Sequence, residues 1–204
     1  MSNFCSFNCR HFLNTSVYFF SVSNMKFKII GTIFLYLFSN SVLSACEGLL
    51  DEKVKILNEK KYQNLCEYSG KTILVVNTAS KCGFTYQYEE LEQLQRRFSK
   101  DEFTVLGFPS RNFLYQEFTD EEEVAEFCKS TFDVTFPLFS ITNVNAVNTH
   151  PFFEKLFKIT QKRPSWNFHK YLITTEGEVK SFSHRMNPSD PQIVEAIQQS
   201  INLK

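Results

Sequence analysis

Apolar and polar residues alternate in blocks along much of the chain. The run Thr72-Ile73-Leu74-Val75-Val76 is β-branched and apolar, which predicts a buried strand. After it, apolar residues recur at helical spacing among Glu, Gln and Arg, at Tyr88, Leu91, Leu94 and Phe98. The same periodicities predict strands over 72–78, 103–108, 168–174 and 178–183, a short strand or extended run near 136–141, and helices over 86–99, 120–131, 150–159 and 190–202.

Strands that alternate with helices and end in a hairpin and a last helix indicate an α/β fold, with a mixed central β-sheet flanked by helices. Glu176-Gly177 is typical of the hairpin turn, and the run over 119–123 places a capping residue and carboxylates at the start of the helix over 120–131. Residues 47–58 are charged and lack a long apolar period. We therefore expect them to be a tether leading into a small hairpin, with the fold starting in earnest at Thr72.

Cys82 lies where the strand over 72–78 gives way to the first helix. A cysteine in the first turn of a helix meets unpaired N–H groups and the positive end of the helix dipole, which favour a thiolate. Together with Gly83 and Lys81, this position predicts an exposed, electropositive and reactive cysteine. The alternative is an inert cysteine buried as a small hydrophobic side chain.

Length and charge limit the classes of function. The 204 residues, 43% of them hydrophobic, suffice for one domain and an extension. Lys plus Arg and Asp plus Glu number 22 each, which gives a net charge of zero, so nucleic acid is not an expected partner.

The N-terminal segment has the layout of a secretory signal. From Met25 the chain has a basic start, an apolar run over 29–38 and then small residues. Leu43-Ser44-Ala45-Cys46 resembles the bacterial lipobox, which would make Cys46 a lipidated N-terminus. We therefore expect a signal or anchor extension over 1–46, a globular domain over 47–204, and an exported, periplasmic or membrane-anchored protein. If the extension is not a signal, the expected location is cytoplasmic.

Asn77–Thr85 resembles the active-site segment of the glutathione peroxidase family in its cysteine form. Gly107-Phe108-Pro109 with Gln116-Glu117, and Trp166-Asn167-Phe168, follow in the family's order. The resemblance implies a thioredoxin-like fold over roughly 55–200, without a cofactor or metal. It also implies reduction of hydrogen peroxide or organic hydroperoxides in oxidative stress defence, through a thiolate and sulfenic acid cycle.

The same resemblance assigns Gln116, Trp166 and Asn167 to the catalytic surroundings of Cys82. In the absence of this resemblance, Gln116 would be interpreted as a solvated side chain, Trp166 as a core residue and Asn167 as a turn residue. Where the family commonly has two glycines, this chain has Leu114 and Tyr115. Because bulky residues disfavour φ > 0, this favours a different loop path, along which Gln116 is either kept in place or displaced. The match in spacing still favours Gln116 over Asn112 as the site residue.

A sulfenic acid needs a second thiol to return to the reduced state. Cys128 on the helix over 120–131 is either a resolving thiol, reached by local unfolding, or a buried core cysteine, while Cys66 is a less favoured candidate. The expected reductant is glutathione or a thioredoxin-like protein. The short segment between Leu156 and Trp166 lacks the Gly-rich loop of oligomeric relatives, which favours a monomer. The competing hypothesis is a non-catalytic, membrane-tethered, thioredoxin-like binding module.

Overall fold

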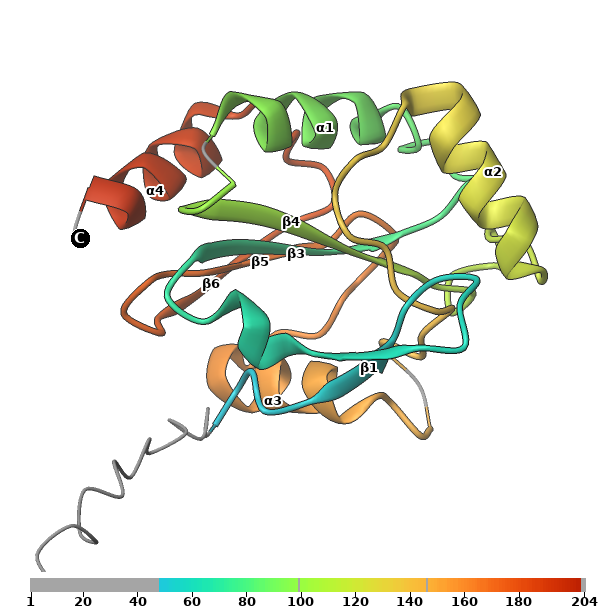
Figure 1. Ribbon diagram of the computed structural model, residues 1–204, viewed down its shortest axis with the longest axis horizontal. Coiled ribbons are helices and arrows are strands. Elements are labelled where there is room, and N and C mark those ends of the chain that lie inside the picture. Colours follow the sequence, from blue (N-terminus) through green and yellow to red (C-terminus); the bar gives the residue numbers. More distant parts are fainter. Residues whose placement is uncertain (1–47, 99, 146, 203–204) are drawn as a thin grey trace, which may run out of the picture. The chain divides into compact units, whose positions relative to one another are not determined.

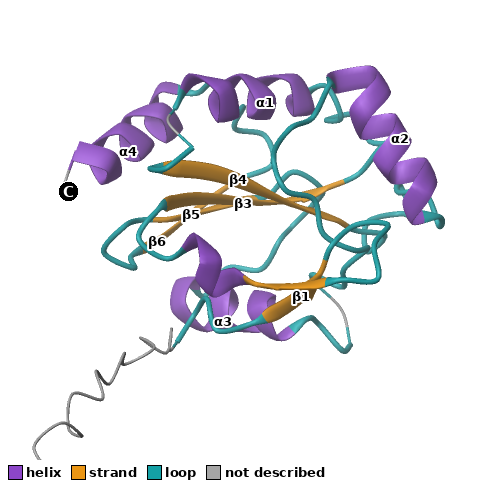
Figure 2. Ribbon diagram, in the orientation of Figure 1, coloured by secondary structure: helices purple, strands orange, loops and turns teal. Residues whose placement is uncertain are grey.

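A four-stranded mixed sheet forms the centre of the computed structural model, which describes residues 48–98, 100–145 and 147–202 (Figures 1 and 2). Its strands are β3 (Thr72–Thr78), β4 (Phe103–Pro109), β5 (Lys170–Ile173) and β6 (Val179–Phe182), in the order β4-β3-β5-β6. β3 and β4 are parallel, whereas β5 runs antiparallel to both β3 and β6. The predicted mixed sheet is therefore confirmed.

Helices cover both faces of this sheet. They are α1 (Gln87–Arg97), α2 (Glu121–Phe132), α3 (Pro151–Thr160) and α4 (Pro191–Asn202). In Figure 1, α1 and α4 lie on one side of the sheet, and α3 lies on the other with the hairpin of β1 (Lys53–Lys55) and β2 (Tyr62–Asn64). A short 3-10 helix (Leu65–Tyr68) follows the hairpin.

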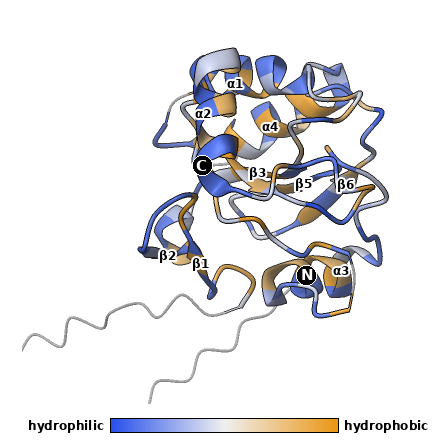
Figure 3. Cartoon of the chain, turned by 90° about the vertical axis from the view of Figure 1, so that its right-hand side faces the viewer, coloured by the Kyte–Doolittle hydropathy of each residue, from blue (hydrophilic) through white to orange (hydrophobic). Residues whose placement is uncertain are grey.

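Alternation along β3 divides the core between these two layers. Leu74 and Val76 pack in a cluster with Leu91 of α1 and Ile197 of α4. Ile73 and Val75 pack instead with α3 and the β1–β2 hairpin. Figure 3 accordingly shows both hydrophobic and hydrophilic colours on the helices, as expected when each helix buries one face against a sheet.

One prediction about chain organisation was wrong. β1 falls inside the expected tether, and its Val54 is buried together with Leu57, so the fold begins before Thr72. The β1–β2 hairpin packs on the sheet and thereby buries residues that lack a long apolar period of their own. The run near 136–141 follows the second of its two predicted alternatives, since it makes isolated bridges, Gly107 with Leu138 and Ile56 with Phe139, and is not a regular strand.

The predicted signal features, including Met25 and Cys46, lie outside the described residues. Within the described ranges, the helices are too short and too polar to cross a membrane.

Candidate active site

Cys82 lies in a loop rather than in a helix. α1 begins at Gln87, so the predicted position in the first helical turn was wrong. Successive tight turns fill the interval, with the Thr85 N–H donating to the Cys82 carbonyl at 3.1 Å. The Thr85 hydroxyl oxygen also accepts from the Cys82 N–H at 3.0 Å and lies 2.9 Å from the Ala79 carbonyl. The Thr85 side chain thus bonds to backbone groups that would otherwise pair with each other in a helix.

The Cys82 sulfur is more sheltered than the sequence predicted, since the residue is only 8% exposed. The backbone N–H of Phe84 points to the sulfur at 3.5 Å, a donor that favours negative charge there. Lys81 is exposed, but its ammonium lies over the ring of Phe118, 3.8 Å from the ring centre. The loop thus supplies a shielded thiol with one backbone donor, instead of an open electropositive one.

Gln116 and Asn167 meet beside this loop. The Asn167 side-chain N–H donates to Gln116 Oε1 at 3.1 Å. The Gln116 carbonyl accepts from the backbone N–H of Lys81, next to Cys82, at 2.8 Å. Asn167 Oδ1 is buried and has no hydrogen-bond partner among the described residues. A buried acceptor of this kind is unusual in a folded protein and is suited to a donor group of a substrate.

The loop before Gln116 keeps this residue beside the Cys82 loop, which is the first of the two outcomes that the sequence left open. Leu114 and Tyr115 adopt φ values of 52° and 53°, the left-handed conformation that glycine takes readily. The two bulky residues therefore accept strain and leave Gln116 within reach of Asn167.

Trp166 is fastened to the sheet through its backbone. The Asn77 side-chain N–H donates to the Trp166 carbonyl at 3.1 Å, and the Phe168 N–H donates to the Asn77 carbonyl at 2.6 Å. The half-buried indole packs against Phe113, with the ring centres 5.6 Å apart. Asn77, near the end of β3, thus holds the loop that carries two predicted site residues, a role that the sequence did not reveal.

Lys170 is a second residue that the sequence analysis missed. It is fully buried, and its ammonium donates to Gln87 Oε1 at 2.6 Å, to the Phe168 carbonyl at 2.8 Å and to the Met186 carbonyl at 2.7 Å. Burial lowers its pKa from 10.5 to about 7. The only signal in the sequence is its position between Phe168 and Leu172 on the buried face of the strand.

His184 stands beside the Cys82 loop. Its ring meets Phe84 edge-on, with ring centres 5.1 Å apart, and its Nδ1 lies 3.3 Å from the Ser165 hydroxyl. Burial, followed by the nearby charges of Arg185 and Lys170, lowers its pKa. The imidazole is therefore neutral near pH 7.

Cys128 lies in the core, on the inner side of α2. Burial, reinforced by the Glu117 carboxyl, raises the pKa of its thiol to about 12, despite an opposing hydrogen bond with Tyr88. The thiol is thus protonated in the folded state. Cys66, the less favoured candidate, is disulfide-bonded.

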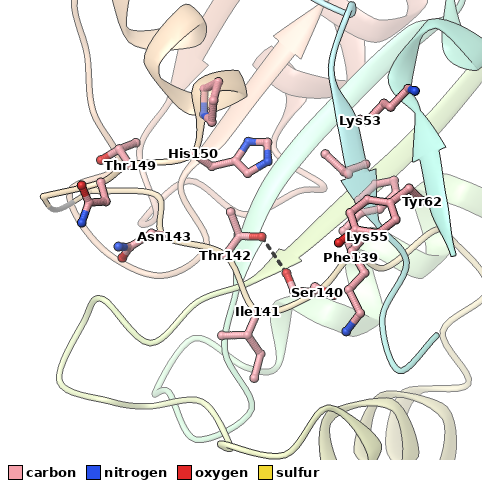
Figure 4. A pocket seen from close by; sticks show the side chains of 13 residues that line it. Lys53, Lys55, Tyr62, Phe139, Ser140, Ile141, Thr142, Asn143, Thr149 and His150 are labelled. Carbon is pink, nitrogen blue, oxygen red and sulfur yellow. Dashed lines mark hydrogen bonds between the residues drawn. The ribbon is translucent and has the colours of Figure 1, made fainter. Parts of the chain in front are cut away.

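A separate pocket of about 340 Å³ lies between the β1–β2 hairpin and the segment over 139–151 (Figure 4). Lys53, Tyr62 and His150 are among its lining residues, and the Thr142 hydroxyl donates to the Ser140 carbonyl at 2.6 Å on its wall. None of the predicted site residues lines this pocket. The candidate active site is therefore the Cys82 loop with its neighbours.

Comparison with known proteins identifies the family. A family model described as glutathione peroxidase matches residues 50–157. The thioredoxin/glutathione peroxidase BtuE of Escherichia coli is 38% identical over 156 residues, which cover 64% of this chain and 85% of the relative. The glutathione peroxidase-like peroxiredoxin HYR1 of Saccharomyces cerevisiae is 40% identical over 129 residues, which cover 60% and 79% of the two chains.

Solved structures agree with these relatives. The crystal structure of Trgpx in its apo form has a TM-score of 0.60 at 34% identity, and the match covers 76% of this chain and 97% of that one. A thioredoxin-family thiol:disulfide interchange protein from Chlorobium tepidum has a TM-score of 0.56 at 12% identity, covering 74% and 92%, and shares the fold alone. The thioredoxin-like fold is confirmed, and relatives named as peroxidases do not favour the non-catalytic binding module. This chain belongs to the glutathione peroxidase family and is a thiol-dependent peroxidase.

Proposed function

We propose that this peroxidase uses Cys82 as its nucleophile, with Gln116, Asn167 and Trp166 around the reacting oxygens. The observation that carries the proposal is the bonded pair of Gln116 and Asn167 next to the Cys82 loop, with Asn167 Oδ1 left without a partner. The O–H of a hydroperoxide is a donor that can satisfy this acceptor.

In the first step the Cys82 thiolate attacks one peroxide oxygen. The S–O bond forms as the O–O bond breaks, and the departing alkoxide or hydroxide takes up a proton to leave as alcohol or water. The sulfur is oxidised to sulfenic acid by two electrons, and the peroxide is reduced by the same two. In this proposal the Gln116 amide and the Trp166 indole act as hydrogen-bond donors that stabilise the developing negative charge.

Replacement of the nucleophile tests this assignment. Cys82→Ser is expected to reduce peroxide consumption to the uncatalysed level, because the hydroxyl of serine is a far weaker nucleophile at neutral pH. Asn167→Ala is expected to lower kcat/KM by roughly ten- to a hundredfold. Cys128→Ala is the matched control and should keep the first turnover. Unchanged turnover in Cys82→Ser would eliminate the assignment.

For the reductant, we propose a thioredoxin-like dithiol protein acting on a disulfide between Cys82 and Cys128. The Cys128 thiol would attack the sulfenic sulfur and release water, and the incoming dithiol would reduce the resulting disulfide. In the folded state Cys128 is buried and its pKa is raised, so α2 must open locally before the thiol reacts.

Peptide mapping after one equivalent of peroxide decides between the two cycles. A crosslink between Cys82 and Cys128 supports the dithiol cycle. Sulfenic acid or a glutathione adduct at Cys82, with Cys128 still unmodified, would exclude it and make glutathione the direct reductant.

We also propose that the mature protein is an exported monomer that begins at a lipidated Cys46. The support is the basic start at Met25, the short apolar run and the small residues before Cys46. Mass spectrometry of the membrane fraction should find the first 45 residues removed and a lipid on Cys46. An intact N-terminus in the soluble cytoplasmic fraction would refute the export proposal, and size-exclusion chromatography tests the monomer.

A further inference from the structure

α2 buries the fewest side chains of the helices α1 to α4, as the structure describes them. Its buried residues are Val124 and Cys128, and Phe127 adds a contact with Phe118, with the ring centres 6.0 Å apart. Because few buried contacts give a low free energy of local opening, α2 is the helix expected to open most readily. Such opening is what the proposed attack of Cys128 on oxidised Cys82 requires.

A buried carboxyl group lies beside this helix. Glu117 is only 2% exposed, and its Oε1 accepts from the Phe118 N–H at 2.9 Å. Its Oε2 is buried without a hydrogen-bond partner among the described residues, and none of the ion pairs found within them involves Glu117. A carboxylate that is buried without a paired cation weakens the structure that buries it.

The groups that face Glu117 come from three segments. They are Ser80 and Lys81 of the Cys82 loop, Tyr88 of α1 and Cys128 of α2. Burial raises the pKa of the Glu117 carboxyl, and nearby hydrogen-bond donors and the Lys81 charge oppose this rise without cancelling it. Burial also raises the pKa values of Tyr88 and Cys128, so both stay protonated at neutral pH. Below pH 8, Glu117 is therefore the acidic group of this cluster that can ionise.

We propose that Glu117 controls access to Cys128. As a carboxylate it favours the open form of α2, in which water reaches it, and when protonated it keeps α2 closed. The inference rests on the proposed disulfide cycle, in which the Cys128 sulfur bonds to the sulfenic sulfur of Cys82. The S–O bond breaks, and the thiol proton leaves with the hydroxide as water. The rate of this step is then proportional to the fraction of molecules in which α2 is open.

Ionisation of Glu117 makes the opening of α2 depend on pH. The closed form holds the carboxyl with a raised pKa, whereas the open form returns it to its ordinary value of 4.5. The open form therefore loses the proton at a lower pH than the closed form does, and the open fraction increases as the pH rises above that value. A difference of one unit between the two pKa values corresponds to about a tenfold increase.

Hydrogen exchange of the α2 amides, divided by the intrinsic rate of exposed amides, measures this opening. From pH 5 to pH 8 the opening constant of the wild type should rise by about tenfold, while in Glu117→Gln, which carries no charge, it should stay within about twofold. Glu126→Gln is the matched control, because it removes an exposed carboxyl from the same helix, and it should keep the rise of the wild type. The same pH dependence in both variants would overturn the role of Glu117.

An independent variant changes the charge that faces Glu117. Lys81→Met removes the cation that opposes the raised pKa of the carboxyl, so the opening constant should rise more steeply with pH than in the wild type. An unchanged or shallower rise would contradict the proposal even if Glu117→Gln failed to fold.

Disulfide formation after one equivalent of peroxide tests the consequence for the chemistry. The rate in Glu117→Gln divided by the rate in Glu126→Gln should fall by about tenfold from pH 5 to pH 8, and this ratio cancels the ionisation of Cys128 itself. If the wild type forms no crosslink between Cys82 and Cys128, the disulfide cycle fails and the inference fails with it. If the crosslink forms and the ratio stays constant with pH, the cycle stands and only the role of Glu117 is wrong.

Discussion

Lys170→Met is the substitution that most directly tests how the site is held together. The lysine ammonium joins three segments: the start of α1 at Gln87, the carbonyl of Phe168 beside Asn167, and the loop at Met186. Methionine fills a similar volume but donates no hydrogen bond, so three acceptors lose their donor. Each buried acceptor left unpaired costs about 1–3 kcal/mol.

The pKa of Lys170 gives this change a characteristic dependence on pH. The pKa falls from 10.5 to about 7 in the folded state because burial disfavours the ammonium. Between these two pH values the unfolded chain keeps the proton that the folded protein has released, so stability increases with pH. The slope approaches about 1.4 kcal/mol per pH unit, which gives a rise of about 2 kcal/mol between pH 7 and pH 9.

Chemical denaturation at several pH values measures this difference. The variant lacks the titrating group. The difference between the unfolding free energies of wild type and variant should therefore widen by about 2 kcal/mol from pH 7 to pH 9. Lys180→Met, on the exposed part of β6, is the matched control and should show no such widening. Peroxidase kcat/KM should fall in Lys170→Met, because the loop of Asn167 loses a fixed contact.

A gap that stays constant from pH 7 to pH 9 would refute this reasoning. It would mean that Lys170 remains charged throughout that range, with its three acceptors offsetting the loss of hydration.

Other expectations concern single contacts around the same sheet. Burial lowers the pKa of His169 to about 4, so the wild type should lose about 3 kcal/mol as pH falls from 6.5 to 4, and His169→Gln should lack that loss when unfolding is measured across this range. In Gly107→Ala the added Cβ would lie 2.5 Å from Leu138, and thermal unfolding should show a destabilisation of about 1–3 kcal/mol, whereas Gly83→Ala, with nothing within 4 Å of its Cβ, should be close to neutral. Asn77→Ala removes the hydrogen bond that holds the loop of Trp166 and should lower steady-state kcat/KM by about tenfold. The rate of Cys82 alkylation should not fall in proportion.

The sequence by itself determined the elements and the family. Apolar runs such as 72–78 and the helical spacing of Leu91 and Leu94 predict which residues of an element are buried. Such patterns depend only on residues that are near one another in the chain. The order of the motifs around Cys82, Gln116 and Trp166 was enough to identify a glutathione peroxidase. The helical spacing predicted the start of α1 to within one residue. It did not predict the turns that keep Cys82 outside the helix, because the Thr85 side chain competes there for the backbone hydrogen bonds.

Only the tertiary structure decided how the site is assembled. The path of the loop at Leu114 depends on its anchors on Trp166 and Asn167, which are distant in the chain, so backbone preference alone could not fix it. Lys170 and Cys128 likewise owe their shifted pKa values to burial by several elements. Desolvation and hydrogen bonds between distant segments arise only when these segments pack together, and no local pattern of residues encodes them.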